Sequence, residues 1–346
     1  MNLRNVQTWG ALGRPFATGF ILSVALLLLP LAALGEGEVA EEAPPLLLPA
    51  SPTPVAEPTP TPGEWDAGQT LRVLQRDGTV AEMTMGDYLW SVVAAEMPAS
   101  FEPEALRAQA VCARTYSLWK LRAGSHEEDG ADICADSACC QAYLSPEDAA
   151  QRWAGDAQAF SAKIAAAVAD TDGQVLTYNG APIQAVFFSS AAGSTADAEE
   201  VWGRALPYLV PVDSPEGDEV PNYHSTVTLT AEEVRKLAQT AGLGCDLSGE
   251  PAGWFTNVKR TASGRVETVE LGGAQLSGGA ARSLFSLRSA CFDVTQAEGV
   301  FTFSVTGYGH GVGMSQYGAN AMAKAGSGWR EIVEHYYTGA AIQTGV

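Results

Sequence analysis

Glu96 is an acidic residue on the apolar side of an expected helix. Three apolar residues precede it at positions i, i+3 and i+4, with Glu96 itself at i+7: Leu89, Val92 and Val93. A helix through them places the Glu96 carboxyl on the apolar face. Pro98 disfavours helical backbone at the residue before it, so the helix is expected to end at or just after Glu96.

Burial and the negative end of the helix dipole would both raise the pKa of the Glu96 carboxyl. An acid that keeps its proton near neutral pH can protonate a leaving oxygen and then act as a base. The alternative is a glutamate at a helix end that extends into solvent. Glu96 is therefore the candidate general acid and base of the chain.

Two arginines follow on the next expected helix. Pro103 suits the first position of a helix that runs to about Lys120, and Arg107 and Arg114 are seven residues apart on one side of it. They could bind carboxylates of a ligand. Equally, they could belong to a solvated helix face, with Arg107 paired to Glu104.

A histidine and three cysteines stand close together after this helix: His126, Cys134, Cys139 and Cys140. Imidazole and thiolate ligands suit zinc. The adjacent Cys139 and Cys140 are not expected to face one metal together, so only three ligands can be named. Outside the cytoplasm, a disulfide from Cys134 to Cys139 or Cys140 is the competing interpretation.

Two segments combine small and polar residues. SSAAGST, residues 189–195, allows close approach of backbone to a ligand, although a polar turn is the ordinary interpretation. GYGHGVGMSQYGA, residues 307–319, has alternating glycines around His310. A glycine inside a strand costs ~0.5–1 kcal/mol relative to alanine, so this pattern indicates close approach of the backbone to another group, including a sugar. The histidine is either catalytic or structural.

The elements that must position these residues alternate irregularly. Residues 71–84 contain Asp77-Gly78 between two apolar runs, which is typical of a hairpin. Strands are expected at 173–190 and 260–271, and helices at 157–168, 231–242 and 327–337. We predict an α+β fold, a single mixed domain of helices and antiparallel strands.

The first 35 residues predict a membrane segment. Arg4 and Arg14 precede an apolar run at 16–34, which at about 1.5 Å per residue would reach ~28 Å, about one bilayer core. Basic residues before the run and acidic residues after it orient the bulk of the chain outside the cytoplasm. We expect an anchor; a cleaved signal segment is the alternative, because small residues stand near the end of the run.

Residues 36–68 predict an acidic linker rich in proline and threonine. Its centre, PPLLLPASPTPVAEPTPTP, favours extended polyproline backbone and so a semi-rigid stalk. A ligand for a peptide-recognition domain is the alternative. The domain that carries the candidate site is then expected at 69–346.

Charge restricts the possible partners. The 346 residues include 40 acidic and 20 basic ones, for a net charge of −20, and 46% are apolar, enough for a sizeable core. This balance argues against binding to nucleic acid and to anionic lipid, because both require clustered lysine and arginine. An acidic cell-wall polymer would have to be bound through local charges.

Seven motifs together resemble a known family. They are YLWSVVAAEMP, EALRAQAVCARTYSL, CQAY, SSAAGST, VWGRALPYL, GHGVGMSQYGA and HYYTGA, in this order between about residues 71 and 339. The set resembles the SpoIID/LytB family of stage II sporulation protein D. The resemblance implies a membrane-anchored, extracytoplasmic lytic transglycosylase that acts during engulfment in sporulation. Such enzymes cleave the β-1,4 bond between MurNAc and GlcNAc in peptide-stripped glycan strands and leave 1,6-anhydro-MurNAc ends.

The resemblance also implies roles for particular residues. Glu96 would be the catalytic acid and base, and a structural zinc ion would be held by His126, Cys134 and Cys140, which favours zinc over the disulfide. Arg107 or Arg114 would bind the lactyl carboxylate of a peptide-free MurNAc. Further glycan contacts are expected from Gln141, Tyr143, Ser189, Ser190, Thr195, His310 and Gln316.

The implied partners are peptidoglycan glycan strands, the sporulation amidase SpoIIP and a membrane scaffold. Two other functions stay open. Relatives of the LytB branch are described as amidase enhancers, so the chain could bind glycan without cleaving it. A hydrolytic metal centre of an amidase or peptidase would require an open zinc position near a base.

Overall fold

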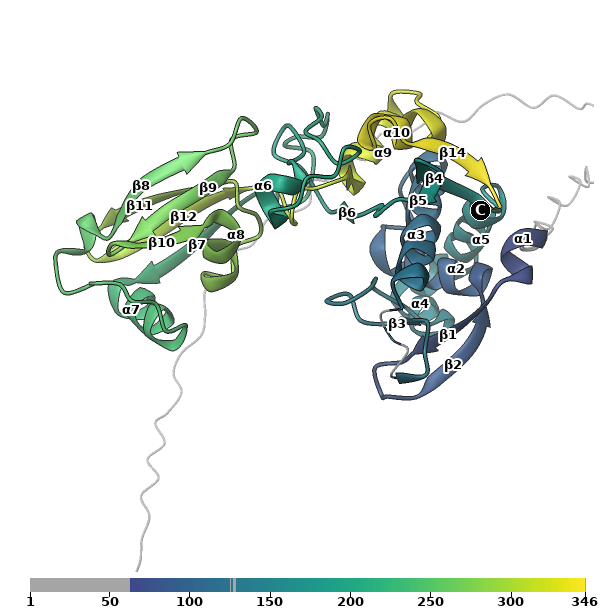
Figure 1. Cartoon of the computed structure of the whole chain (residues 1–346), viewed down its shortest axis with the longest axis horizontal. Helices are drawn as coiled ribbons and strands as arrows, with labels where there is room; N and C mark the ends of the chain where they lie inside the picture. Colours follow the sequence, from purple (N-terminus) through teal and green to yellow (C-terminus); the bar gives the residue numbers. More distant parts are fainter. Residues whose placement is uncertain (1–62, 125, 127–128, 346) are drawn as a thin grey trace, which may run out of the picture. The chain divides into compact units, whose positions relative to one another are not determined.

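The computed structural model describes residues 63–124, 126 and 129–345 (Figure 1). It confirms a mixed α+β fold in which most strand pairs are antiparallel. The expected membrane segment and nearly all of the expected linker lie outside the described residues. Within those residues, none of the helices combines the length and the apolar character that crossing a bilayer requires.

The first hydrophobic core is built around α3 (Pro103–Ala123), which contacts α2 (Met85–Glu96), α5 (Ala157–Ala169), α9 (Gln316–Lys324) and α10 (Trp329–Tyr336). Small side chains explain how one helix packs against so many neighbours, since Ala105, Ala108, Ala110 and Ala113 are fully buried. Helix α4 (Pro146–Trp153) and the 3-10 turn Ala154–Asp156 pack against α5. The expected helices at 103–120 and 157–168 are confirmed.

Three small sheets border this core. They are β2–β1–β3 (Val80–Thr84, Thr70–Leu74, Ile133–Cys134), β14–β4–β5 (Ala341–Thr344, Gln174–Tyr178, Ala181–Pro182) and β13–β6 (Met314–Ser315, Phe187–Phe188). The β1–β2 hairpin is confirmed. The expected strand at 173–190 is divided into β4, β5 and β6. The pairs β1–β3 and β6–β13 are parallel, which the sequence analysis did not predict.

A second hydrophobic core lies in residues 224–306, drawn in green (Figure 1). Its sheets are β11–β12–β7 (Phe292–Ala297, Val300–Thr306, His224–Thr230) and β10–β9–β8 (Ala274–Ser277, Val266–Leu271, Phe255–Arg260). Helices α7 (Ala231–Thr240) and α8 (Gly278–Leu284) and the 3-10 turn Pro251–Gly253 complete it. Aromatic rings fill this core, with Phe303 against Phe285, Phe292 and Phe255.

The folded body begins before residue 69. Helix α1 (Glu64–Gly68) falls in the expected linker, yet its Asp66 is fully buried and its backbone is bound by Asp172. The short helix α6 (Ala198–Trp202) was also not predicted. Both elements matter below, because α1 determines the role of Arg114 and α6 contributes to the pocket.

Candidate active site

Helix α2 positions Glu96. Thr84 caps the start of the helix by accepting a hydrogen bond from the Asp87 amide, and Met97 is extended at its end. The apolar face is buried as predicted, with Leu89, Val92 and Val93 inaccessible. Glu96 is thus the last residue of the helix, and its side chain is only partly exposed.

The Glu96 carboxyl meets two groups from distant segments. Its Oε1 accepts a hydrogen bond of 2.7 Å from the Ala142 amide. Burial raises the pKa of this carboxyl, and the opposing effects of the Ala142 amide and the Gln316 side chain do not cancel that rise. The direction that the sequence predicted is therefore confirmed, with burial as its cause.

Glu96 lines a pocket of about 730 Å³. Four other residues expected to bind glycan also line it: Gln141, Ser189, His310 and Gln316. They come from the loop after β3, the end of β6, the loop after β12 and the start of α9. The structure therefore brings residues up to 220 positions apart to one cavity.

His310 is held as a neutral imidazole. Its Nδ1 accepts a hydrogen bond from the Val312 amide at 3.2 Å, so a proton on the neutral ring is on Nε2. Burial lowers the pKa of His310 to about 4, and the nearby positive charges of Arg282 and Arg265 act in the same direction. The ring also packs near Trp202, with centroids 5.4 Å apart.

The glycines around His310 allow backbone segments to pack closely. Gly309 and Gly313 have φ of 120° and 76°. A Cβ on Gly313 would lie 2.1 Å from the Val186 carbonyl oxygen, and one on Gly309 would lie 2.7 Å from Cβ of Phe188. The close approach predicted from the sequence is confirmed, but in this structure the neighbour is the protein's own chain around β6.

Two glutamines lie between the first core and the pocket. Gln141 is buried and donates from Nε2 to Ser117 at 3.0 Å, while its Oε1 has no partner among the described residues. Gln316 is also buried, and its Nε2 lies 3.4 Å from Oε1 of Gln109. Gln141 lines the pocket, although its unpaired Oε1 is itself buried.

The structure does not place the two predicted arginines at the pocket. Arg114 is fully buried and makes a bidentate pair with Asp66, Nε to Oδ1 at 2.8 Å and Nη2 to Oδ2 at 2.5 Å. Arg107 pairs with Asp170 at 2.6 Å and with Glu104, as the alternative interpretation expected. Their expected role in carboxylate binding is therefore corrected, because their donors are already engaged by the protein's own acids.

Three other expected glycan contacts also lie away from the pocket lining. Tyr143 stacks on Tyr88 with centroids 6.2 Å apart. Ser190 is buried and bridges to Tyr308, and Thr195 is buried and accepts from the Val212 amide at 2.9 Å. These side chains and backbone groups hold the loops that form the pocket.

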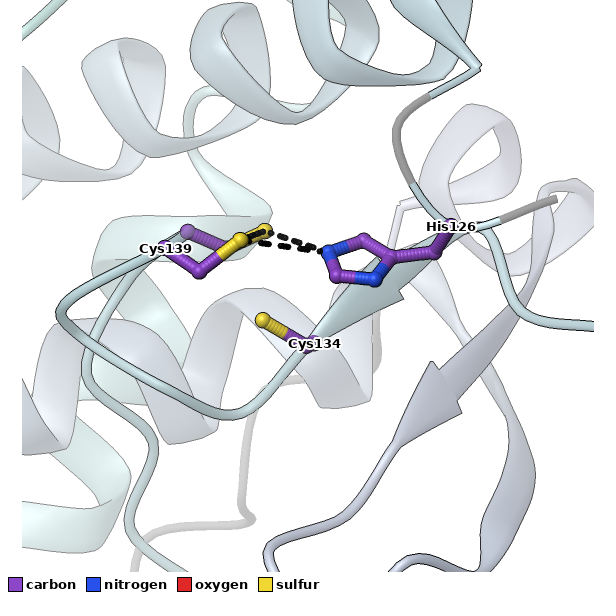
Figure 2. Close-up of side chains that lie close together, drawn as sticks. His126, Cys134 and Cys139 are labelled. Carbon is purple, nitrogen blue, oxygen red and sulfur yellow. Dashed lines mark hydrogen bonds between the residues drawn. The ribbon is translucent and has the colours of Figure 1, made fainter. Parts of the chain in front are cut away.

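The histidine and cysteine side chains converge on one point (Figure 2). The ligand atoms of His126, Cys134, Cys139 and Cys140 all lie within 4.8 Å of one another. His126 Nε2 is 3.4 Å from the sulfurs of both Cys139 and Cys140, which are 3.9 Å apart. Cys139 and Cys140 were not expected to face one metal together, but both sulfurs point to His126, so this expectation is wrong.

The cluster has the geometry of a metal site. Around a tetrahedral zinc ion, bond lengths of ~2.3 Å to sulfur and ~2.0 Å to nitrogen place two sulfurs ~3.8 Å apart and a sulfur ~3.5 Å from the nitrogen. His126 Nδ1 lies 3.2 Å from a carboxylate oxygen of Asp129, which leaves Nε2 for the metal. All six cysteines are free, so the competing disulfide is not formed in this structure.

The sequence analysis missed several residues of the site. Arg282 lines the pocket, but it comes from a segment with no local sign of a site. Tyr308 and Trp202 also line it; they lie in the motifs GYGHGVGMSQYGA and VWGRALPYL but were not among the expected contacts. Outside the pocket lining, Glu216 is buried and accepts hydrogen bonds from the Ala191 amide and Ser214, both at 2.6 Å. An acid within a polar segment, as Glu216 is, would ordinarily be assigned to the surface.

The comparisons with known proteins agree with these motifs. A family profile described as stage II sporulation protein (SpoIID) matches residues 75–178. The chain is 39% identical over 267 residues to stage II sporulation protein D of Bacillus amyloliquefaciens, which is 76% of this chain and 75% of that protein. It is 40% identical over 266 residues to the protein of the same name from Bacillus subtilis (strain 168), 76% of each chain.

A more distant relative has a different name. The chain is 27% identical over 314 residues to the amidase enhancer of Bacillus subtilis (strain 168), covering 73% of this chain and 40% of that protein. The matches at about 40% identity extend far beyond the segment 75–178. On these grounds, the chain belongs to the SpoIID family of stage II sporulation proteins.

Proposed function

We propose that this chain is a peptidoglycan lytic transglycosylase in which Glu96 is the only catalytic carboxyl group. One observation carries the proposal: Glu96 is the sole Asp or Glu among the residues that line its pocket in the described part of the chain. Glycosidases that hydrolyse their substrate ordinarily use two carboxyl groups. A reaction that needs one acid and no positioned water fits this lining better.

The reaction would proceed in two proton transfers. Protonated Glu96 gives its proton to the oxygen that links MurNAc to GlcNAc, and the bond from that oxygen to C1 of MurNAc breaks. The Glu96 carboxylate then accepts the proton of the 6-hydroxyl of the same MurNAc as O6 bonds to C1. The products are a free GlcNAc hydroxyl and a 1,6-anhydro ring, with no water consumed. Because the nucleophile belongs to the substrate, the attack is intramolecular.

The surroundings of Glu96 suit this cycle. Burial favours the protonated acid that begins the reaction, and the Ala142 amide favours the carboxylate that follows. His310 is uncharged above about pH 4, since burial lowers its pKa to that value. We assign Gln141, Ser189, His310 and Gln316 to hydrogen bonds with sugar hydroxyl and acetamido groups.

The cluster of one histidine and three cysteines supports a structural role for zinc. His126 with Cys134, Cys139 and Cys140 supplies four ligands, which would leave no open position for a hydrolytic water. This donor set argues against the amidase or peptidase alternative. When bound, zinc would hold the loop whose Ala142 amide reaches Glu96.

A non-enzymatic function is the second candidate. The relative named amidase enhancer supports it, because a protein of that kind could bind glycan without cutting it. Glu96 would then only hydrogen-bond a sugar. Anchorage, an extracytoplasmic location, and contacts with an amidase such as SpoIIP and a membrane scaffold are further parts of the proposal that rest on the sequence.

Product analysis tests the proposal. The full chain is incubated with peptide-free glycan strands, and the fragments are examined by mass spectrometry. Anhydro ends are one water lighter than hydrolysed ends. Glu96→Gln should lower the rate by at least ~10²–10⁴-fold. The matched control Glu334→Gln, on the exposed side of α10, should retain it. Absence of anhydro ends with the unchanged chain, while Glu96→Gln still binds strands, would sink the enzyme proposal and favour the enhancer.

A further inference from the structure

Apart from the imidazole of His310, one basic side chain lines the pocket of Glu96 among the described residues. Within the described residues, Arg282 of α8 is the only lysine or arginine that lines it. Arg282 belongs to the second core and Glu96 to the first, so the two residues reach one cavity from separately packed elements. No ion pair joins them among the described residues.

Arg282 has no carboxylate at ion-pair distance among the described residues. Only its Nε donates within the described part of the chain, to the Arg288 carbonyl at 3.1 Å, which leaves both terminal nitrogens free. By contrast, each ion-paired arginine has a carboxylate at hydrogen-bond distance: Arg72, Arg107, Arg114 and Arg260. Arg282 therefore presents a positive charge with free donors at the pocket that contains Glu96.

The surroundings of Arg282 make its unpaired positive charge energetically unfavourable when no ligand is bound. Arg282 is half-buried, and burial lowers its pKa, as does the positive charge of the neighbouring Arg265. A partly buried charge without a counter-ion is unfavourable. The cost is offset when an anion binds, and a planar guanidinium with two free amino groups prefers a carboxylate in bidentate geometry.

We propose that Arg282 binds the lactyl carboxylate of a peptide-free MurNAc in the strand, an inference that rests on glycan being the ligand of this pocket. A stem peptide converts that carboxylate into an amide, so the negative charge is present only on stripped strands. Arg282 thereby makes the pocket selective for peptide-free glycan. It takes the role that the sequence analysis gave to Arg107 and Arg114.

Binding in a cleavage-blocked background tests this directly. The full chain with Glu96→Gln is compared with Glu96→Gln/Arg282→Gln on three ligands. These are stripped strands, the same strands with the lactyl carboxylates reduced to alcohols, and uncharged chitin oligomers. Affinity for stripped strands should fall roughly ten- to a hundredfold in the Arg282 variant, with little change on the two neutral ligands. Arg282→Lys should restore part of the loss.

A matched charge control separates this effect from net charge. Lys236→Gln removes one positive charge from the exposed face of α7, outside the pocket, and should leave all three affinities unchanged. The Glu96→Gln chain should itself prefer stripped over reduced strands, a comparison that needs no change at Arg282. Equal affinity for stripped and reduced strands, or equal loss on all three ligands, would overturn the inference. If no anhydro ends form but the carboxylate preference is found, the enzyme proposal fails and this binding role stands.

Discussion

At the scale of single residues, Glu96 combines a useful protonation state with a cost in stability. Burial raises its pKa in the folded chain, so the folded state holds this proton more tightly than the unfolded state does. The contribution of protonated Glu96 to the stability of the fold is complete below the pKa that Glu96 has in the unfolded chain. It is lost as pH rises through the higher pKa that Glu96 has in the folded chain. Ionised Glu96 therefore destabilises the fold.

We expect Glu96→Gln to be more thermostable than the unchanged chain at alkaline pH, because it removes the buried negative charge. The gain should shrink as pH falls and vanish below ~pH 4, where the carboxyl is protonated in both states. Thermal unfolding as a function of pH measures it. Glu334→Gln, in an exposed position, should show no such trend; a gain of the same size at every pH would contradict the assigned cause.

Replacing each of the two arginines of α3 should change the stability of the protein by very different amounts. Arg114→Leu leaves Asp66 buried without its partner and should cost ~3–5 kcal/mol. Arg107→Ala disrupts partly exposed pairs and should cost only ~0–1 kcal/mol. Urea denaturation compares them, and adding Asp66→Leu to Arg114→Leu should recover part of the loss. Similar costs at both sites would contradict the assigned burial.

These residues show what the sequence could reveal. The position of Glu96 at the end of a helix with a buried apolar face was predictable, because its helical spacing and Pro98 are local features. The burial of Arg114 was not, because Asp66 is 48 residues away in a segment whose composition indicated a linker. Likewise, no local pattern connects Arg282 with Glu96, since α8 and α2 contribute to one cavity only in the folded chain.

At the scale of elements, the loop after β3 connects the cluster of His126 and three cysteines to Glu96. Cys139 and Cys140 are turned toward His126, and two residues later the Ala142 amide binds Glu96. The same two cysteines also line the pocket. If a metal is bound there, its loss should therefore alter the candidate active site as well as the stability of the loop.

Cys139→Ser should weaken zinc binding by at least ~10–100-fold, the cost of losing even an outer partner of a ligand. Cys245→Ser, outside the cluster, should not change it. Competition with a metal indicator measures the affinity. Cobalt substituted for zinc should give a thiolate charge-transfer band that loses about a third of its intensity in Cys139→Ser, since one of three thiolates is removed. An unchanged band would exclude Cys139 from the ligand set.

Regular elements were predictable where their signals were local. The helices at 103–120 and 157–168 and the hairpin at 71–84 rest on apolar spacing and turn residues that the chain supplies nearby. The central strand β12 was missed, although its burial alternates through Phe301, Phe303 and Val305. The two-residue strands β3, β6 and β13 have no pattern of their own, because distant partners create them.

At the scale of the whole molecule, net charge and local charge act in opposite directions. The chain carries −20, whereas the proposed substrate is itself anionic, so long-range repulsion slows their encounter. Added salt shortens the screening length from ~30 Å at 0.01 M to ~8 Å at 0.15 M. Added salt should weaken this long-range repulsion more than it weakens the short-range attraction between Arg282 and the substrate carboxylate.

We therefore expect kcat/KM on stripped strands to rise severalfold between these two salt concentrations. Binding of uncharged chitin oligomers should be nearly constant over the same range, which makes them the reference. Initial rates of anhydro-end formation provide the measurement. A decrease of kcat/KM with salt would show that attraction, not repulsion, governs the encounter.

The Asp66–Arg114 pair has a mechanical consequence. The amino-terminal segment joins the folded domain at α1. Two buried hydrogen bonds between Asp66 and Arg114 connect α1 to α3. Tension applied from the amino-terminal side would act on the hydrogen bonds between Asp66 and Arg114 before it reached α2 and Glu96. Helix α2, which carries Glu96, would thus be protected from tension applied to the amino-terminal side.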